Sequence, residues 1–251
     1  MTIRYIAAMT PVRPVWKRSI DLAAGVVALP LLAVVGGVLA IWLGFVSPGP
    51  VLFRQRRVGY RGRIFHLYKF RTMHLGAETG SHQAHVTALL RSNQPMQKLD
   101  GGIDPRVVPG TWVIRASGLD ELPQLLNVLR GEMSLVGPRP CMPYEYKHYT
   151  VSQRRRCGVL PGLTGLWQVS GKNRTTFETM IALDTEYCRR RSPGLDLRIM
   201  ALTVPVLLAQ ILETARQRRR HRPPARTTAA GATRPAPPAG TSGRSPAPLS
   251  S

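Results

Sequence analysis

The chain opens with a long apolar segment. From Leu22 to Val46 there are 25 consecutive residues without a charge, more than the roughly 20 that cross a bilayer as a helix. This length is too great for the apolar region of a cleavable signal peptide, and no small-residue cleavage site follows. The pattern therefore predicts a helix within the membrane.

The residues alone leave two paths of this segment through the membrane possible. Basic residues precede it (Lys17, Arg18) and follow it (Arg54, Arg57), so the positive-inside rule draws both ends to the cytoplasmic side. Pro30 lacks the N–H of a helix interior and breaks or bends the helix there. The segment is either a re-entrant hairpin, entering and leaving on one face, or a spanning helix with a proline kink.

Alternation replaces this apolar run in the next part of the chain. Residues 51–59 and 63–73 alternate apolar with basic side chains and are rich in aromatic and β-branched types, which predicts a short β-hairpin turning at residues 60–63. One face of it is strongly positive. Lys69 and Arg71 on this hairpin either bind phosphate, lie on a solvated face, or anchor the protein to anionic lipid.

Helical spacing returns after Ser117, which is predicted as the N-cap of a helix carrying Asp120 and Glu121 in its first turn. Pro123 either lies near the true start of this helix or bends its first turn, and Gly131 ends it. The apolar stripe consists of Leu122, Leu125, Leu126 and Leu129.

A second apolar run, residues 199–212, contains Pro205 and is too short to span a bilayer in comfort, so we expect it at the membrane interface or beside the first segment. The fold class predicted is α+β, mostly helical. The expected organisation is an N-terminal segment (1–15), a membrane helix (16–50), a catalytic domain (51–215) and a disordered basic tail rich in Pro, Ala and Ser (216–251).

Charge narrows the choice of partner. The chain has 35 Lys and Arg against 13 acids, a formal charge of +22, and the eight arginines after Thr214 supply +8, leaving +14. Such an excess predicts nucleic acid, a phosphorylated substrate or an anionic membrane leaflet as partner. Aromatic residues make up only 6% of the chain and no nucleic-acid-binding module is present, which disfavours the first. The three cysteines form no metal-binding spacing and are expected to be reduced thiols.

Two further clusters are ambiguous. His74, His82 and His85 have no acid or Cys placed to complete a metal site, so solvated loop histidines are expected. The Gly-rich residues 161–173 lack the spacing of known phosphate-binding loops and are expected to form a loop with tight turns.

In a chain this poor in acid, the adjacent carboxylates Asp120 and Glu121 are the leading candidates for chemistry. A carboxylate serves as nucleophile, base or metal ligand, although a pair at a helix start more often only caps the helix. Arg139, between Pro138 and Pro140, has a restricted backbone suited to holding a phosphate in fixed geometry.

Three ordered motifs resemble one known family. The strings LDELPQLLNVLRGEMSLVGPRP, KFRTM and PGLTGLWQVSGKN resemble the bacterial sugar transferase family, the polyprenyl-phosphate hexose-1-phosphate transferases or monotopic phosphoglycosyl transferases, over about residues 16–212. The resemblance implies a re-entrant membrane helix broken near Pro30 and a location on the cytoplasmic face of the bacterial inner membrane.

The resemblance also implies the chemistry. Asp120 matches the nucleophile that attacks a UDP-sugar and releases UMP, and Glu121 matches its partner, which binds Mg²⁺ or activates the acceptor, undecaprenyl phosphate. Asp120 and Glu121 are the expected metal ligands. Asp184 matches a recurrent acid that forms a structural salt bridge or takes part in catalysis. The residues expected to bind phosphate or substrate are Arg139, Arg115, Lys69, Gln168 and Lys172.

The expected function is transfer of a sugar 1-phosphate to undecaprenyl phosphate through a covalent aspartyl intermediate, at the start of a surface polysaccharide or glycoconjugate. The alternative is a non-catalytic, membrane-anchored basic protein that binds anionic lipid or nucleic acid. An inactive family member is a third reading. The intact Asp120, Glu121 and Arg139 favour the enzyme, whereas charge alone supports the binding protein.

Overall fold

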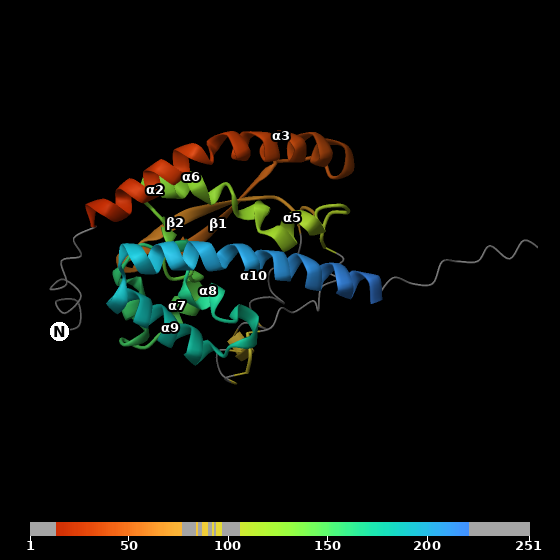
Figure 1. Cartoon of the computed structure of the whole chain (residues 1–251). Coiled ribbons are helices and arrows are strands. Elements are labelled where there is room, and N and C mark those ends of the chain that lie inside the picture. Colours follow the sequence, from red (N-terminus) through yellow and green to blue (C-terminus); the bar gives the residue numbers. More distant parts are fainter. Residues whose placement is uncertain are drawn as a thin grey trace, which may run out of the picture. The chain divides into compact units, whose positions relative to one another are not determined.

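The structure is a computed structural model that describes residues 14–76, 84, 87–89, 92, 94–96 and 106–220. The predicted N-terminal segment up to residue 13, His82, His85 and the basic tail from residue 221 lie outside the described residues. The fold is mostly helical α+β, as predicted, with a β-hairpin and two long apolar helices (Figure 1).

The apolar segment forms two successive helices, α2 (Val15–Val27) and α3 (Leu29–Val46), which divide at Ala28. Pro30 falls in the first turn of α3, where the missing N–H removes no intrahelical hydrogen bond. Most apolar side chains of α3 face outward; Val34, Val38, Ile41 and Phe45 are all exposed. α3 and the later helix α10 are the two described helices long and apolar enough to cross a membrane.

The β-hairpin is confirmed. Strands β1 (Leu52–Val58) and β2 (Ile64–Phe70) pair antiparallel and are joined by the 3₁₀ turn η1 (Tyr60–Gly62). Gly62 has φ 76° in this turn, a left-handed conformation that favours glycine.

The predicted start of the helix at Ser117 is wrong. Ser117 ends a short unpredicted helix, α5 (Trp112–Ser117), and Gly118 stops it with φ 73°. Leu119–Glu121 then form a separate 3₁₀ turn, η2, and Pro123 is the N-cap of α6 (Gln124–Arg130). Apolar spacing predicts one helix here. The left-handed conformation of Gly118 and the nearby Pro123 divide it into two elements.

We expected the Gly-rich residues 161–173 to form a loop, but part of this segment is a β-strand. Gly162–Thr164 form β4, which pairs parallel with β3 (Ser134–Val136). A Cβ built on Gly162 would lie 2.0 Å from the backbone nitrogen of Gly137. The glycines therefore allow two backbones to approach more closely than any side chain permits.

The remaining elements cover these strands and the cleft beside them. α10 continues through Pro205 to Arg220, well beyond the apolar run seen in the sequence. Residues 216–220, which we expected in the disordered tail, are therefore helical. The remaining elements, in chain order, are α7 (Pro143–His148), η3 (Gln153–Gly158), α8 (Leu166–Val169), η4 (Lys172–Arg174), α9 (Phe177–Arg190) and α10 (Pro193–Arg220).

Two buried clusters form the core. The larger contains Leu67 of β2, Leu125 and Val128 of α6, Val136 of β3 and Tyr187 of α9. The smaller surrounds Trp167, Cys141 and Phe177, among others. All three cysteines are free thiols, as expected. The first cluster places β2, η2–α6 and β3 next to one another, and the candidate active site lies where these elements end.

Candidate active site

The two adjacent carboxylates lie on η2, the 3₁₀ turn between α5 and α6. The Glu121 carboxylate accepts a hydrogen bond from the Lys69 ammonium group of β2, at 2.6 Å. Asp120, the preceding residue of η2, is half-buried. The structure thus joins Lys69 to the acid pair, although 50 residues separate them in the chain.

Burial and nearby charges give the two carboxylates different pKa values. Burial raises the pKa of Asp120 to about 6, and the negative charge of Glu121 adds to this effect against the opposing charge of Lys69. Burial also works against ionisation of Glu121, but the cations Lys69 and Arg139 outweigh it and lower the pKa of Glu121 to about 2. Glu121 is therefore held as a carboxylate, whereas Asp120 is the more basic member of the pair.

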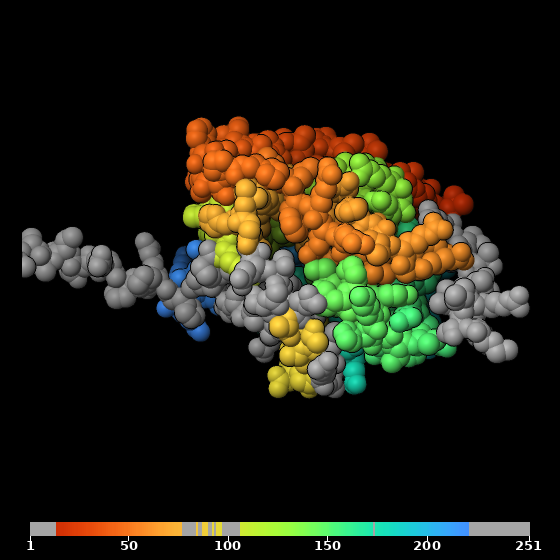
Figure 2. Space-filling model, turned by 180° about the vertical axis from the view of Figure 1, so that it is seen from behind, coloured from red at the N-terminus to blue at the C-terminus, as the bar shows by residue number. Residues whose placement is uncertain are grey.

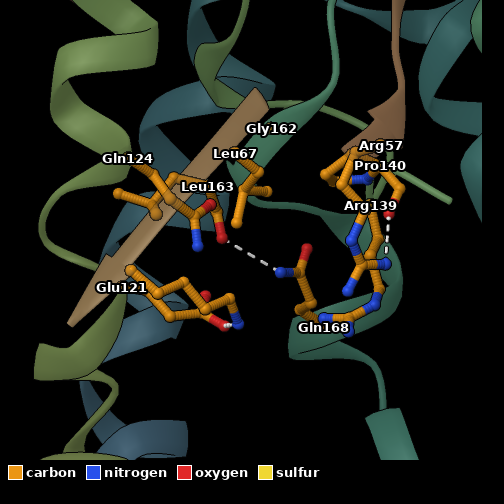
Figure 3. A pocket seen from close by; sticks show the side chains of 10 residues that line it. Arg57, Leu67, Glu121, Gln124, Arg139, Pro140, Gly162, Leu163 and Gln168 are labelled. Carbon is orange, nitrogen blue, oxygen red and sulfur yellow. Dashed lines mark hydrogen bonds and ion pairs between the residues drawn. The ribbon is translucent and has the colours of Figure 1, made fainter. Parts of the chain in front are cut away.

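A cleft opens beside Glu121. In Figure 3, Glu121 lies on one side of it, Arg57 and Arg139 on the other, and the Gln168 amide between them. Three lining residues are cations and one is an acid, an imbalance that favours an anionic ligand. The lining residues are Arg57, Leu67, Lys69, Glu121, Gln124, Arg139, Pro140, Gly162, Leu163 and Gln168.

Arg57 is a functional candidate that the sequence reasoning missed. It is buried, it donates to the carbonyl oxygen of Pro140 at 3.0 Å, and its pKa is lowered to about 10 by burial and by the charge of Arg139. The hairpin register pairs Arg57 with Phe65 and Phe53 with Lys69. Reading the predicted hairpin with period two would have placed Arg57 on the same face as Lys69.

The Arg139 turn is held by buried arginines. Arg156 of η3 donates to the Arg139 carbonyl oxygen at 2.9 Å, next to the Arg57 bond to Pro140. Arg156 also forms a buried ion pair with Asp184 of α9. Asp184 therefore lies in a structural salt bridge behind the Arg139 turn, one of the two readings its sequence position allowed.

Of the other predicted site residues, Gln168 lines the cleft, whereas Arg115 and Lys172 are not among its lining residues. Gln168 donates to the Leu163 carbonyl oxygen at 3.0 Å. Arg115 donates to the Thr72 hydroxyl at 3.3 Å, and its charge lowers the pKa of Asp120 against the larger effect of burial. Lys172 donates to Gln210 of α10 at 3.2 Å.

Arg71, which the sequence allowed as a phosphate ligand, has another position. It is buried and donates to the Pro50 carbonyl oxygen at 2.7 Å and to the Ser47 hydroxyl at 2.8 Å. These bonds fasten the end of α3 to the end of β2. Arg71 is thus an anchor for the apolar helix and does not line the cleft.

The donor set at the carboxylates fits magnesium. Within the part of the chain that the structure describes, no three His, Cys, Asp or Glu side chains gather as a cage for a metal. Mg²⁺ usually needs no such cage, because it binds through one or two carboxylates together with substrate phosphates and water. Asp120 and Glu121 supply such a pair, and the cations across the cleft suit a phosphorylated ligand.

The arrangement suits phosphoryl transfer. An ionised carboxylate with a raised pKa is a competent nucleophile, and its neighbour stays charged beside a lysine. Fixed guanidinium groups across the cleft neutralise charge that develops on phosphate oxygens. Such chemistry requires positioning and charge neutralisation more than any further functional group.

The sequence matches one protein family over most of its length. The family described as bacterial sugar transferase matches residues 12–210. This range includes the apolar helices, the hairpin, the acid pair and the Arg139 turn.

Curated relatives agree with this match. The chain is 41% identical over 201 residues to the galactosyl transferase CpsE of Streptococcus agalactiae, covering 76% of this chain and 42% of CpsE. It is 38% identical to the exopolysaccharide production protein ExoY of Rhizobium meliloti, covering 80% of this chain and 88% of ExoY. It is 39% identical to the UDP-glucose:undecaprenyl-phosphate glucose-1-phosphate transferase of Xanthomonas campestris, covering 68% of this chain and 34% of that protein. The chain thus spans less than half of two of these relatives and most of ExoY.

Proposed function

The chain belongs to the bacterial sugar transferase family, and on this premise we propose that it is a phosphoglycosyl transferase that moves a hexose 1-phosphate from a UDP-sugar to undecaprenyl phosphate. The relative from Xanthomonas is named for this reaction with glucose. The observation that carries the proposal is Glu121, which is tied to Lys69 and faces Arg57 and Arg139 across one cleft, with Asp120 next to it in η2.

In the first step, a carboxylate oxygen of Asp120 attacks the β-phosphorus of the UDP-sugar. A bond forms between this oxygen and phosphorus, the bond from phosphorus to the bridging oxygen breaks, and UMP leaves with that oxygen. The product is a mixed anhydride of Asp120 and the sugar phosphate. Arg139 and Arg57 stabilise the negative charge on the phosphate oxygens during this step.

In the second step, a phosphate oxygen of undecaprenyl phosphate attacks the same phosphorus. The bond to Asp120 breaks, the free carboxylate returns, and undecaprenyl diphospho-sugar leaves. The acceptor is a dianion near neutral pH, so it attacks without losing a proton. This makes Glu121 more useful as a fixed charge, or as a magnesium ligand, than as a base.

Magnesium would be held by Asp120 and Glu121 and would neutralise charge on the diphosphate of the donor. Lys69 keeps Glu121 ionised and orients it through the 2.6 Å hydrogen bond. Gln168 of the cleft, together with Lys172 and Arg115, is proposed to bind the remaining donor oxygens.

The apolar segment is proposed to be re-entrant, with both of its ends on the cytoplasmic face. At its start, Lys17 of α2 forms an ion pair with Asp196 at 2.5 Å, and Asp21 accepts hydrogen bonds from Ser134 and Leu135 of β3. At its end, Arg71 holds Ser47. Since both ends contact the same folded domain, and α2 and α3 run along one side of it (Figure 1), a segment with its ends on opposite faces of a bilayer does not fit these contacts.

The proposed organisation follows from this topology. The catalytic domain, residues 51–215, lies against the membrane on the cytoplasmic side, with residues 16–50 embedded in one leaflet. α10 adds a second apolar surface, with Leu202, Val204, Leu208 and Leu212 exposed. The basic tail predicted from residue 216 shares residues 216–220 with α10, and the rest of it follows this helix in the chain.

Cysteine labelling tests the topology. Single cysteines are placed at Thr10 and Arg63 in a background that carries Ala at the three native cysteines. We expect both to react with a membrane-impermeant maleimide only in inside-out vesicles, in which the cytoplasmic face is exposed. Arg63 is exposed, whereas the neighbouring Gly62 has φ 76° and would bring a side chain into the Tyr146 hydroxyl. Reaction of the two positions from opposite faces would rule out the re-entrant segment.

A donor panel tests the reaction itself. Membranes containing the protein, with magnesium and undecaprenyl phosphate, are expected to release UMP from at least one member of a panel of UDP-glucose, UDP-galactose and N-acetylated UDP-hexoses. UMP release should require both magnesium and the lipid for repeated turnover. Absence of UMP release from every donor would contradict the proposed function.

A further inference from the structure

We propose that a basic patch on the outer face of the β-hairpin binds the headgroup phosphate of an anionic phospholipid. The basic patch consists of Arg54 and Arg56 of β1, Tyr68 of β2 and Arg130 of α6. The strand register pairs Arg54 with Tyr68. Since side chains alternate along a strand, the patch lies on the face opposite Arg57 and Lys69 and is distinct from the candidate active site.

Two guanidinium groups meet on one aromatic ring in this patch. The Arg54 guanidinium carbon lies 5.6 Å from the Tyr68 ring centroid, and that of Arg130 lies 5.1 Å from it. Both arginines are exposed. Tyr68 therefore gathers two like charges from different elements and restricts the orientation of both.

No acid forms an ion pair with Arg54 or Arg130 in the part of the chain that the structure describes; the ion pairs there involve Lys17, Lys69, Arg156 and Arg190. Two guanidinium groups held on one ring without a counter-charge repel each other. A phosphate group that accepts hydrogen bonds from the planar forks would offset this repulsion.

The surroundings of the basic patch identify the source of the phosphate. Along the same face of the hairpin, Leu52 pairs with Phe70 at the end nearest α3, and the arginines follow farther along β1. α3 packs directly on this end, since a Cβ on Gly36 would lie 3.3 Å from the Phe70 ring. The order away from α3 is therefore apolar first, with the aromatic ring of Tyr68 and the arginines following together.

This order matches the path from the hydrocarbon to the interface and headgroups, where Tyr, Lys and Arg are found in membrane proteins. Figure 2 shows the orange hairpin surface exposed next to the darker α3. Leu52 is 39% exposed, which suits contact with lipid. An anionic phospholipid of the bilayer that holds α3 is thus within reach, and the inference does not rest on the transfer reaction.

The test measures lipid retention by the full chain. Protein in detergent micelles doped with equal amounts of phosphatidylglycerol and phosphatidylcholine is analysed by native mass spectrometry. Wild type is expected to retain phosphatidylglycerol preferentially. In the variant Arg54→Gln/Arg130→Gln, the ratio of retained phosphatidylglycerol to phosphatidylcholine should fall by about 25-fold. Each cation near anionic lipid raises the affinity for that lipid by about fivefold.

A matched control is Arg155→Gln/Arg189→Gln, which removes two exposed arginines from η3 and α9 and should keep the preference. Equal loss in both variants, or no loss in the patch variant, would overturn the proposal. Displacement of phosphatidylglycerol by an equal concentration of inorganic phosphate would also overturn it, in favour of a free-anion site. UMP release from the same samples in phosphatidylcholine alone should be unchanged by the patch variant, so failure of the lipid site and of the proposed reaction can be told apart.

Discussion

Replacing Asp120 with Asn is expected to lower the rate of UMP release by about 10³-fold or more. The amide cannot act as the nucleophile that forms the anhydride, and the fixed charges that remain cannot supply that bond. The measurement is single-turnover UMP release from the preferred UDP-sugar, without acceptor lipid. Wild type should show a burst of one UMP per site and carry one added hexose phosphate by intact mass, whereas Asp120→Asn should show neither.

The acid pair allows an internal comparison. Glu121→Gln keeps the nucleophile, so it should slow the reaction but still form the covalent adduct on Asp120. Glu186→Gln makes the same chemical change at an exposed residue of α9 paired with Arg190, and should leave the burst intact. A full burst from Asp120→Asn, or an adduct mapped to another residue, would contradict the assignment of the nucleophile.

The largest effect on stability is expected from Asp184. Replacing it with Leu leaves the Arg156 guanidinium buried without its counter-charge, and removing one partner of a buried pair costs about 3–5 kcal/mol of unfolding free energy. Arg156 and Asp184 are both almost fully buried, with side chains 2% and 1% exposed. Denaturant unfolding of the detergent-solubilised protein measures the loss.

Activity distinguishes a structural from a catalytic Asp184. The double variant Arg156→Met/Asp184→Leu removes both charges and should recover much of the lost stability, because no unpaired charge stays buried. Since Arg156 holds the Arg139 carbonyl oxygen, we expect this variant to bind the UDP-sugar more weakly while the burst on Asp120 persists. Stability recovered together with complete loss of the burst would instead place Asp184 in the chemistry.

Several elements could be predicted because their signals are local. The 25 uncharged residues and the alternation on either side of the turn at residues 60–63 each depend on neighbours within a few positions, and both elements are present in the structure. The end of α6 at Gly131 was likewise predicted from glycine alone. The start of that helix was wrong because Gly118 adopts a left-handed conformation that apolar spacing does not register.

The partners of the acid pair depend on contacts between distant parts of the chain. Lys69 and Arg57 reach the cleft through the hairpin, and Arg139 reaches it through β3. The hairpin register places Arg57 and Lys69 on one face, but no spacing in the sequence brings Arg139 to them. Its position depends on how β2, α6 and β3 pack around the buried cluster of Leu67, Leu125 and Val136.

The sequence by itself determined the apolar segment, the hairpin, the identity of the candidate carboxylates and the resemblance to one family, because each depends on residues close to one another in the chain. Only the tertiary structure decided that Lys69 pairs with Glu121, that Arg71 anchors α3, and that Arg156 with Asp184 supports the Arg139 turn. The division of Asp120 and Glu121 into a more basic and a permanently charged carboxylate belongs to this second group. A pKa depends on burial and on charges a few ångströms away, and these exist only after the chain has folded.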